Sequence, residues 1–205
     1  MAQIGIIDYQ MGNLASLVNS LAKVGHEAQI VRDPAAIASF GHLILPGVGA
    51  FGDAMAHLKE SGMDEALKAY AQSGRWLLGI CLGLQVLFEK SAESPGVEGL
   101  GLIPGEVVRF DPAQAVHPIK IPHMGWNRTE QQTPSPLFEG VDSGERLYFV
   151  HTYHALCGES TIATACYGYR FTAAVNQNNL FGLQPHPEKS HNTGLKILKN
   201  FTELS

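Results

Sequence analysis

The segment at residues 76–88 constrains the fold more than any other part of the chain. It reads WLLGICLGLQVLF: an apolar run, a glycine, a lone cysteine, a second glycine, and then another apolar run with helix-forming side chains. This order predicts a strand, a sharp turn and a helix, an arrangement that projects a nucleophile from the top of a sheet. Gly79 and Gly83, each two residues from Cys81, leave the space that so sharp a turn requires, because a Cβ at either position would collide with the backbone.

Cys81 is therefore a candidate nucleophile. The N-terminal end of the following helix carries partial positive charge, which favours the thiolate over the thiol. The alternative is that Cys81 is a small buried hydrophobic residue, which is the usual role of an intracellular cysteine. A glycine on each side does not decide between these interpretations, so the hypothesis depends on a second group that could act as its base.

Strands and helices alternate over the first ninety residues. Apolar runs typical of strands buried on both faces are separated by segments whose apolar side chains recur at helical spacing. This alternation predicts βαβ units and a mainly parallel sheet with helices on both faces. The strands are predicted at residues 3–8, 28–32, 42–46 and 76–78, and the helices at 14–21 and 53–73, the latter broken near Gly62.

The second half of the chain has a different pattern. Short strands lie close together with turns between them, as in antiparallel hairpins, and a final helix closes the chain. The strands are predicted at 107–110, 147–150, 161–167, 171–176 and 180–183, the helix at 192–201, and loops at 91–104 and 131–136. We find neither an internal repeat nor a linker, so the sequence predicts one α/β domain over residues 1–205, with a mainly parallel central sheet, flanking helices and an antiparallel extension.

Composition and charge exclude several classes of protein. The chain has 205 residues, of which 45% are hydrophobic, enough for one domain with a sizeable core. Its formal net charge of -5 provides no basic surface for nucleic acid or an anionic membrane, and no apolar run reaches the ~18 residues of a membrane span. Three scattered cysteines form no disulfide framework and the N-terminus lacks a secretion signal, so we expect a cytoplasmic protein.

A second chemical motif lies at residues 184–188, which read QPHPE. Prolines on both sides of His186 hold the segment extended, and in an extended segment residues two apart point to the same side. His186 and Glu188 can therefore form a hydrogen bond. A thiol nucleophile needs such a pair, because one imidazole nitrogen accepts the thiol proton while the carboxylate fixes the tautomer through the other nitrogen.

A third motif, PGVG, follows a predicted strand at residues 46–49. Attack on an amide creates an oxyanion, which preorganised backbone N–H groups can stabilise. The amide of Leu82, directly after the candidate nucleophile, can provide one donor. The peptides of Gly47, Val48 and Gly49 can turn inward to provide another, because the glycines lack a Cβ.

The elbow GICLGLQ and the HPE motif resemble those of the class I (triad) glutamine amidotransferases, which hydrolyse glutamine to glutamate and ammonia. Within that family the chain is most similar to the glutaminase subunits of imidazole glycerol phosphate synthases, enzymes of histidine biosynthesis. The motifs that carry this second resemblance span nearly the whole chain in order: DYQMGNL at 8–14, LPGVGAF at 45–51, PHMGWN at 122–127, YFVHTYH at 148–154 and HPEKS at 186–190.

The resemblance implies a role for each group of residues. Cys81 would be the nucleophile that forms a thioester, His186 the acid and base, and Glu188 the residue that orients the imidazole. The peptides at 47–49 would form the oxyanion strand, which in this family can reorient before the hole is complete. The residues implied to bind glutamine are Gln85, Glu93 at the α-ammonium group, and the backbone of His151, Thr152 and Tyr153 at the α-carboxylate. The resemblance implies no cofactor and no metal.

The resemblance also implies a partner, a (βα)8-barrel cyclase that forms a heterodimer with the glutaminase and uses its ammonia to make imidazole glycerol phosphate and AICAR. Ammonia released into water would be protonated and lose its nucleophilicity, so a closed passage between the subunits is expected. Asn13, Trp126 and Lys189 would lie on the face toward the cyclase, although Trp126, which we place in a polar loop, could instead belong to the core. Two positions depart from the family pattern: Pro185 replaces an aromatic residue, and Gln10 stands where glycine is common.

The sequence also allows other interpretations. His151 and His154, with Cys157 nearby, could bind a metal, but a strand does not align residues three apart and no further ligand completes the set, so structural or substrate-loop histidines are favoured. A glutaminase subunit of pyridoxal phosphate synthase or anthranilate synthase would not be expected to carry PGVGAF and PHMGWN. A non-catalytic relative would not need all three triad residues, and a cysteine peptidase fits Gln85 and Glu93 less well than an enzyme for a free amino acid.

Overall fold

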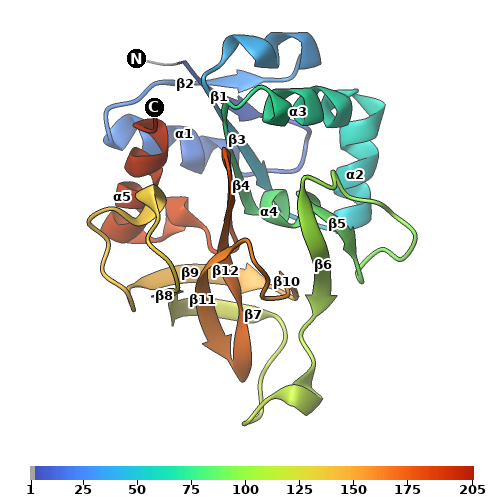
Figure 1. The fold of residues 1–205 in the computed structure, drawn as a ribbon, viewed down its shortest axis with the longest axis vertical. Helices are drawn as coiled ribbons and strands as arrows, with labels where there is room; N and C mark the ends of the chain where they lie inside the picture. Colours follow the sequence, from blue (N-terminus) through green and yellow to red (C-terminus); the bar gives the residue numbers. More distant parts are fainter. Residues whose placement is uncertain (1–2) are drawn as a thin grey trace.

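The computed structural model describes residues 3–205, which form a central sheet of eight strands in the order β2-β1-β3-β4-β13-β12-β11-β8 (Figure 1). Strands β2, β1, β3, β4 and β13 run parallel to one another, and β12, β11 and β8 extend the sheet in antiparallel fashion. The strands are β1 (Ile4–Ile7), β2 (Ala28–Val31), β3 (His42–Gly47), β4 (Trp76–Cys81), β8 (Glu130–Gln131), β11 (Thr161–Tyr167), β12 (Tyr169–Gln177) and β13 (Leu180–Leu183). The predicted fold class is confirmed.

Helices cover both faces of this sheet. Figure 1 shows α1 and α5 on one side of the sheet and α2 and α3 on the other, with α4 directly after β4. The helices are α1 (Leu14–Lys23), α2 (Phe51–Glu60), α3 (Met63–Gln72), α4 (Leu82–Val86) and α5 (His191–Thr202), with short 3-10 helices η1 (Pro34–Ser39), η2 (Pro112–Gln114), η3 (Pro136–Phe138) and η4 (Pro187–Lys189). Gly62 separates α2 from α3 as predicted, with a positive φ of 71° that favours glycine.

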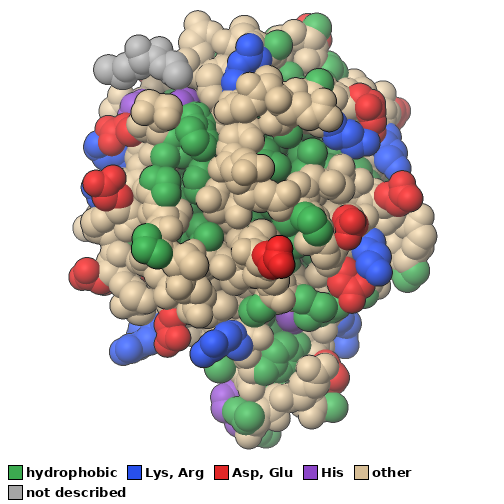
Figure 2. Space-filling model, in the orientation of Figure 1, with side chains coloured by type: hydrophobic (Ala, Val, Ile, Leu, Met, Phe, Trp, Pro, Cys, Tyr) green, Lys and Arg blue, Asp and Glu red, His purple; other side chains and the backbone are tan. Residues whose placement is uncertain are grey.

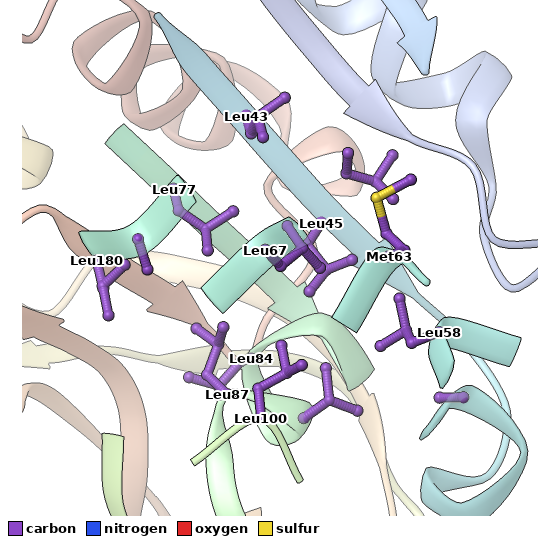
Figure 3. Packing of buried hydrophobic residues seen from close by; sticks show 14 of the residues in the cluster. Leu43, Leu45, Leu58, Met63, Leu67, Leu77, Leu84, Leu87, Leu100 and Leu180 are labelled. Atoms are coloured by element: carbon purple, nitrogen blue, oxygen red, sulfur yellow. The ribbon is translucent and has the colours of Figure 1, made fainter. Parts of the chain in front are cut away.

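The hydrophobic core consists of two clusters, one on each face of the parallel strands. Leu43 and Leu45 of β3 belong to one cluster and Ile44, between them, to the other, because successive side chains of a strand point to opposite faces. Figure 3 shows the first cluster, in which Leu43, Leu45 and Leu77 of the sheet lie near leucines of α2, α3 and α4. The second cluster packs under α1 and α5. Burial on both faces explains why these strands read as continuous apolar runs.

Two smaller sheets lie beside the central one. Strands β5 (Phe88–Ser91), β6 (Ile103–Arg109) and β10 (Tyr153–Ala155) form the first, and β7 (His123–Arg128) pairs with β9 (Arg146–His151) in the second. The prediction that Trp126 lies in a polar loop is therefore wrong, because its segment is strand β7. In HMGWNR the two large apolar residues, Met124 and Trp126, lie on the exposed side of the strand and a histidine on the buried side, so the sequence does not show the pattern of a half-buried strand. Pairing with β9 makes this segment a strand.

The helix after the elbow is shorter than its apolar sequence indicates. It ends at Val86, and Phe88 already belongs to β5. The reason is tertiary: the carbonyl of Val86 accepts a hydrogen bond from the amide of Leu100, and that of Leu87 accepts one from Ile103. These carbonyls would otherwise bond to the next helical turn. The predicted loop at 91–104 is also shorter than expected, since β6 begins at Ile103.

The surface carries charges of both signs. Figure 2 shows Lys, Arg, Asp and Glu side chains interspersed around the visible face, without a patch of one sign. Of the helices formed by residues 3–205, none combines the length and the apolar character needed to cross a bilayer.

Candidate active site

The turn at Cys81 is as sharp as the sequence predicts. Cys81 ends β4 with φ 55° and ψ -108°, a conformation that non-glycine residues rarely adopt. A Cβ at Gly79 would lie 2.5 Å from the carbonyl oxygen of Gly83, and one at Gly83 would overlap the carbonyl oxygen of Leu45 in β3. The two glycines therefore let α4 turn back closely against β3 and β4.

The thiol of Cys81 is buried beside two polar groups. Its Sγ lies 3.8 Å from the side-chain nitrogen of Gln184, which donates to it, and 4.0 Å from the carbonyl oxygen of Val150 in β9. Gln184 was not predicted as a site residue. Its position in the sequence could have identified it, because Gln184 lies two residues before His186 in an extended segment and therefore points to the same side.

His186 and Glu188 form the predicted pair. Nδ1 of His186 lies 2.8 Å from Oε1 of Glu188, and both side chains are buried. The segment is anchored to β9, because the amide of His186 donates to the carbonyl of Tyr148 and the Ser190 hydroxyl accepts from the Tyr148 amide. Burial alone would lower the pKa of His186, but interactions with Cys81 and Glu188 outweigh it and raise that pKa to about 9. The ring can therefore hold a proton taken from the neighbouring thiol.

A cavity of about 380 Å³ lies between these groups, within the size range of small-molecule sites. It brings together most residues predicted to act on or bind the substrate. Its lining consists of Val48, Gly49, Cys81, Leu82, Gln85, Glu93, Pro122, Val150, His151, Thr152, Tyr153 and His186. Glu188 lies outside it and, with Gly47 and Asn13, lines a smaller neighbouring cavity.

Gln85 and Glu93 are held by contacts that the sequence did not reveal. The side-chain nitrogen of Gln85 donates to the carbonyl of Tyr153 at 2.9 Å and to the side-chain oxygen of Gln184 at 3.1 Å. Oε2 of Glu93 accepts a 2.8 Å hydrogen bond from the amide of Phe51, the first residue of α2. This carboxylate thus caps a helix whose own N-cap residue, an alanine, cannot do so.

The oxyanion segment does not point its amide into the cavity. The N–H of Val48 donates to the carbonyl of Met11 at 2.8 Å. Gly47 is paired with Cys81 in the register of β3 and β4, and Gly49 has a positive φ of 109°. Leu82 is the first residue of α4, so its amide has no acceptor within the helix.

The residues predicted to face a partner lie close to the site. Trp126 is 51% exposed and stacks on His191 with an angle of 6° between the rings. Trp126 also contacts the ring of Tyr148, and the Nζ of Lys189 lies 5.8 Å from that ring's centre. Asn13 caps α1 through its side chain. Trp126 and Lys189 therefore belong to one surface around Tyr148.

The metal interpretation finds no support in residues 3–205, where no three His, Cys, Asp or Glu side chains are arranged to hold an ion. His154 instead bonds to the carbonyl of Ala155 and the hydroxyl of Tyr169.

Buried histidines should make the fold sensitive to acid. Burial lowers the pKa of His123 to about 4, so below pH 6.5 the unfolded state binds more protons than the native state and the free energy of unfolding falls. For His123 alone we expect a loss on the order of 2 kcal/mol between pH 7.5 and pH 5. Urea unfolding at both pH values measures it as the difference between wild type and His123→Phe.

The comparison with the variant is needed because His186 acts in the opposite direction. Its raised pKa contributes stability that is present below about pH 6.5 and is lost as the pH rises through about 9. An equal pH dependence of wild type and His123→Phe would contradict the prediction.

Comparison with known proteins agrees with the geometry of the site. Residues 5–204 match the family model "Glutamine amidotransferase class-I". The chain is 56% identical to the imidazole glycerol phosphate synthase subunit HisH of Sulfurimonas denitrificans over 202 residues, covering 98% of this chain and 97% of that protein. It is 52% identical to the subunit of the same name from Wolinella succinogenes, covering 98% and 99% of the two chains.

Solved structures share the fold at much lower identity. PurLQS from Thermotoga maritima superposes with a TM-score of 0.76 at 19% identity, covering 98% of each chain. A structure described as a glutamine amidotransferase superposes with a TM-score of 0.74 at 20% identity, covering 97% of this chain and 98% of that one. With the family match over residues 5–204 and two relatives above 50% identity, the chain belongs to the class I glutamine amidotransferase family.

Proposed function

We propose that residues 1–205 form one catalytic domain that hydrolyses L-glutamine to L-glutamate and ammonia through a thioester on Cys81. One observation carries this proposal: Cys81, at the strained turn after β4, lines the same cavity as His186, whose ring is fixed by Glu188. A thiol, an imidazole and a carboxylate in this order are the groups that such a mechanism requires. The family match and the names of the two bacterial relatives support glutamine as the substrate.

The reaction begins with proton transfer from Cys81 to Nε2 of His186, a buried atom for which the described structure offers no hydrogen-bond partner. The sulfur attacks the side-chain amide carbon of glutamine, giving a tetrahedral intermediate. As the C–N bond breaks, Nε2 returns its proton to the leaving nitrogen and ammonia departs, which leaves a γ-glutamyl thioester. Water, deprotonated by the same nitrogen, attacks the thioester and releases glutamate and the thiol.

Glutamine binding needs groups for both ends of a free amino acid. Glu93 lines the cavity with Oε2 fixed by the amide of Phe51, and its negative charge suits the substrate's α-ammonium group. The backbone of residues 151–153 lines the cavity where the α-carboxylate would bind. Gln85 uses its amide nitrogen to hold the Tyr153 carbonyl, so it supports this wall of the cavity.

The oxyanion hole requires a change at the PGVG segment. The amide of Leu82 is one donor, but the N–H of Val48 is bound to the carbonyl of Met11. This peptide must rotate to give a second donor, and removing one such donor typically costs an enzyme about 10²–10³-fold in rate. We therefore propose that the arrangement described here is a low-activity state and that a partner stabilises the rotated peptide.

The proposed partner is a (βα)8-barrel cyclase of histidine biosynthesis, which would use the ammonia to make imidazole glycerol phosphate and AICAR. Both bacterial relatives are named as subunits of an imidazole glycerol phosphate synthase, which supports a heterodimer. Trp126 and Lys189 lie on one surface around Tyr148, and Asn13 lines the smaller cavity beside His186 and Glu188, which supports a subunit that covers these residues and closes the site from water. Closure would keep the ammonia unprotonated and reactive. A cytoplasmic location stays a prediction.

Glutamate release from L-glutamine tests this function. It is measured for the purified chain alone, with the barrel cyclase of the same organism, and with the cyclase and its nucleotide substrate. We expect a rise of about tenfold or more in the complete mixture, within the range of known couplings between sites. Equal rates in all mixtures would exclude this partner but keep the glutaminase chemistry. No release in any mixture would contradict the proposed function.

A further inference from the structure

A continuous chain of hydrogen bonds leads from strand β7 to the wall of the cavity. The side-chain nitrogen of Asn127 lies 3.3 Å from Nε2 of His123, and Nδ1 of His123 lies 2.9 Å from Nε2 of His151. Nδ1 of His151 lies 2.8 Å from the carbonyl oxygen of Tyr153. Both rings are buried, so solvent does not compete for these bonds.

The orientation of Asn127 is fixed by the backbone. Its side-chain nitrogen donates to the carbonyl of Cys166 at 2.8 Å, and its side-chain oxygen accepts from the amide of Arg128 at 2.8 Å. These two contacts fix which side-chain atom of Asn127 is the nitrogen and which is the oxygen, because a carbonyl only accepts and an amide N–H only donates. Nε2 of His123 therefore faces a donor.

The two ends of the chain determine both tautomers independently. At one end, Nε2 of His123 must accept from Asn127, so the proton of a neutral His123 is on Nδ1. At the other end, the carbonyl of Tyr153 can only accept, so the proton of His151 is also on Nδ1. The contact in the middle then joins an N–H of His123 to a lone pair of His151, and the chain is consistent throughout.

Burial favours the neutral state of His123 and His151 that these hydrogen bonds require. Burial lowers the pKa of His151 well below its ordinary value, more than its bond to Tyr153 raises it, and His123, His154 and His186 lower it further. Burial likewise lowers the pKa of His123 to about 4. Aromatic side chains pack against both rings: Phe149 and Tyr167 stack on His123, and Phe110 and Phe171 lie against His151.

This chain of hydrogen bonds ends at the carbonyl of Tyr153, to which Gln85 also donates. The carbonyl of Tyr153 accepts from both His151 and Gln85, and the same amide nitrogen of Gln85 reaches Gln184, whose side chain contacts the sulfur of Cys81. The Tyr153 carbonyl is thus held from two sides. If His151 lost its donor from His123, it could move its proton to Nε2 and present a lone pair to Tyr153, which would repel the carbonyl.

We propose that His123 and Asn127 are positioning residues for the glutaminase reaction: by fixing the tautomer of His151, they hold the backbone at 151–153 in the conformation that binds the substrate's α-carboxylate. This inference rests on the proposed function and adds residues outside the cavity that set its affinity for glutamine. It does not assign either residue to the chemical step, because neither lines the cavity that holds the thiol and its base.

The first test needs no activity. Imidazole ¹⁵N chemical shifts of the ¹⁵N-labelled wild-type chain at pH 7 report which ring nitrogens carry protons. We expect His123 and His151 both to be neutral with the proton on Nδ1. A proton on Nε2 of either ring, or a charged ring, would overturn this relay, the hydrogen bonds that join Asn127, His123, His151 and the Tyr153 carbonyl. That outcome would count whether or not the protein hydrolyses glutamine.

The second test separates positioning from stability by steady-state kinetics, in the mixture that gives wild-type turnover. His123→Phe keeps the stacking but removes the donor, and we expect KM for glutamine to rise about tenfold with kcat changed by less than about threefold. His123→Asn places an amide nitrogen near the Nδ1 position and should restore KM to within about threefold of wild type. His154→Phe is the matched control, because it removes a buried histidine of the same aromatic cluster that lies outside the relay.

A loss of folded protein alone would lower apparent kcat at unchanged KM and would overturn the proposal. So would a KM for His123→Phe equal to that of His154→Phe. Should His123→Phe fail to fold, His123→Asn and the spectra of the wild type still decide. A wild type without turnover contradicts the proposed function and leaves the spectroscopic result as the test of the relay.

Discussion

Replacing Cys81 with alanine is expected to abolish glutamine hydrolysis while the protein stays folded. Without the thiol no thioester can form, and the loss of a nucleophile that acts with its base typically reduces kcat by on the order of 10⁴-fold or more. The fold should tolerate the change, because alanine fills almost the same space and, like cysteine, has a single Cβ at this positive φ. Glutamate release measures the first effect and thermal unfolding the second.

A matched control is available in the same chain. Cys157 is exposed and lies outside the cavity, so Cys157→Ala should keep wild-type turnover. Both variants are assayed after identical purification, with a glutaminase-deficient host to exclude contamination. Turnover by Cys81→Ala above about 1% of wild type would rule out the thioester mechanism, since the expected loss is far larger.

Replacing Gly83 with alanine should have the largest effect on stability. Glycine to alanine in a helix is ordinarily stabilising by about 0.5–1 kcal/mol. Here the new Cβ would overlap the backbone carbonyl of Leu45, and β3 is buried at every position and cannot move away. We expect a loss of more than about 3 kcal/mol, as for severe overpacking, which corresponds to a fall in Tm of about 6–12 °C for a chain of this size. Urea unfolding at pH 7.5 measures the change.

Gly158→Ala serves as the control for this variant. Gly158 has no atom within 4 Å of the position its Cβ would take, and its φ is not positive. Its substitution should alter the free energy of unfolding by less than about 0.5 kcal/mol, as is usual for surface positions. Equal stabilities of the two variants would show that the turn at Cys81 does not require a glycine at 83.

The sharp turn at Cys81 and the pair of His186 and Glu188 were accessible to sequence reasoning because local geometry determines them. Two glycines around Cys81 predicted a turn that the close approach to Leu45 explains, and the spacing of His186 and Glu188 predicted their hydrogen bond. Continuous apolar runs predicted the parallel strands, since burial on both faces leaves no alternation. These features depend on a few neighbouring residues or on one strand at a time.

The remaining features depend on contacts between distant segments. Strand β7 exists because β9 pairs with it, and α4 ends early because residues 100–103 take the carbonyls of Val86 and Leu87. The cap that Glu93 places on α2, the Val48 amide on Met11, and the relay of His123 likewise join segments far apart in sequence. No periodicity or local spacing reports such pairings.

Strand β13 enters the sheet last in the sequence but lies between β4 and β12. A chain that stops short of residue 180 lacks the strand that pairs with β4 on the side away from β3, and it lacks His186. Under the proposed mechanism, such a shortened chain would hold the thiol of Cys81 without its base and would not hydrolyse glutamine. Pairing of this last strand with both of its neighbours thus completes the hydrogen bonding of the sheet, and the segment that follows it carries His186 to the cavity that Cys81 lines. The order of the chain therefore couples closure of the sheet to assembly of the proposed triad.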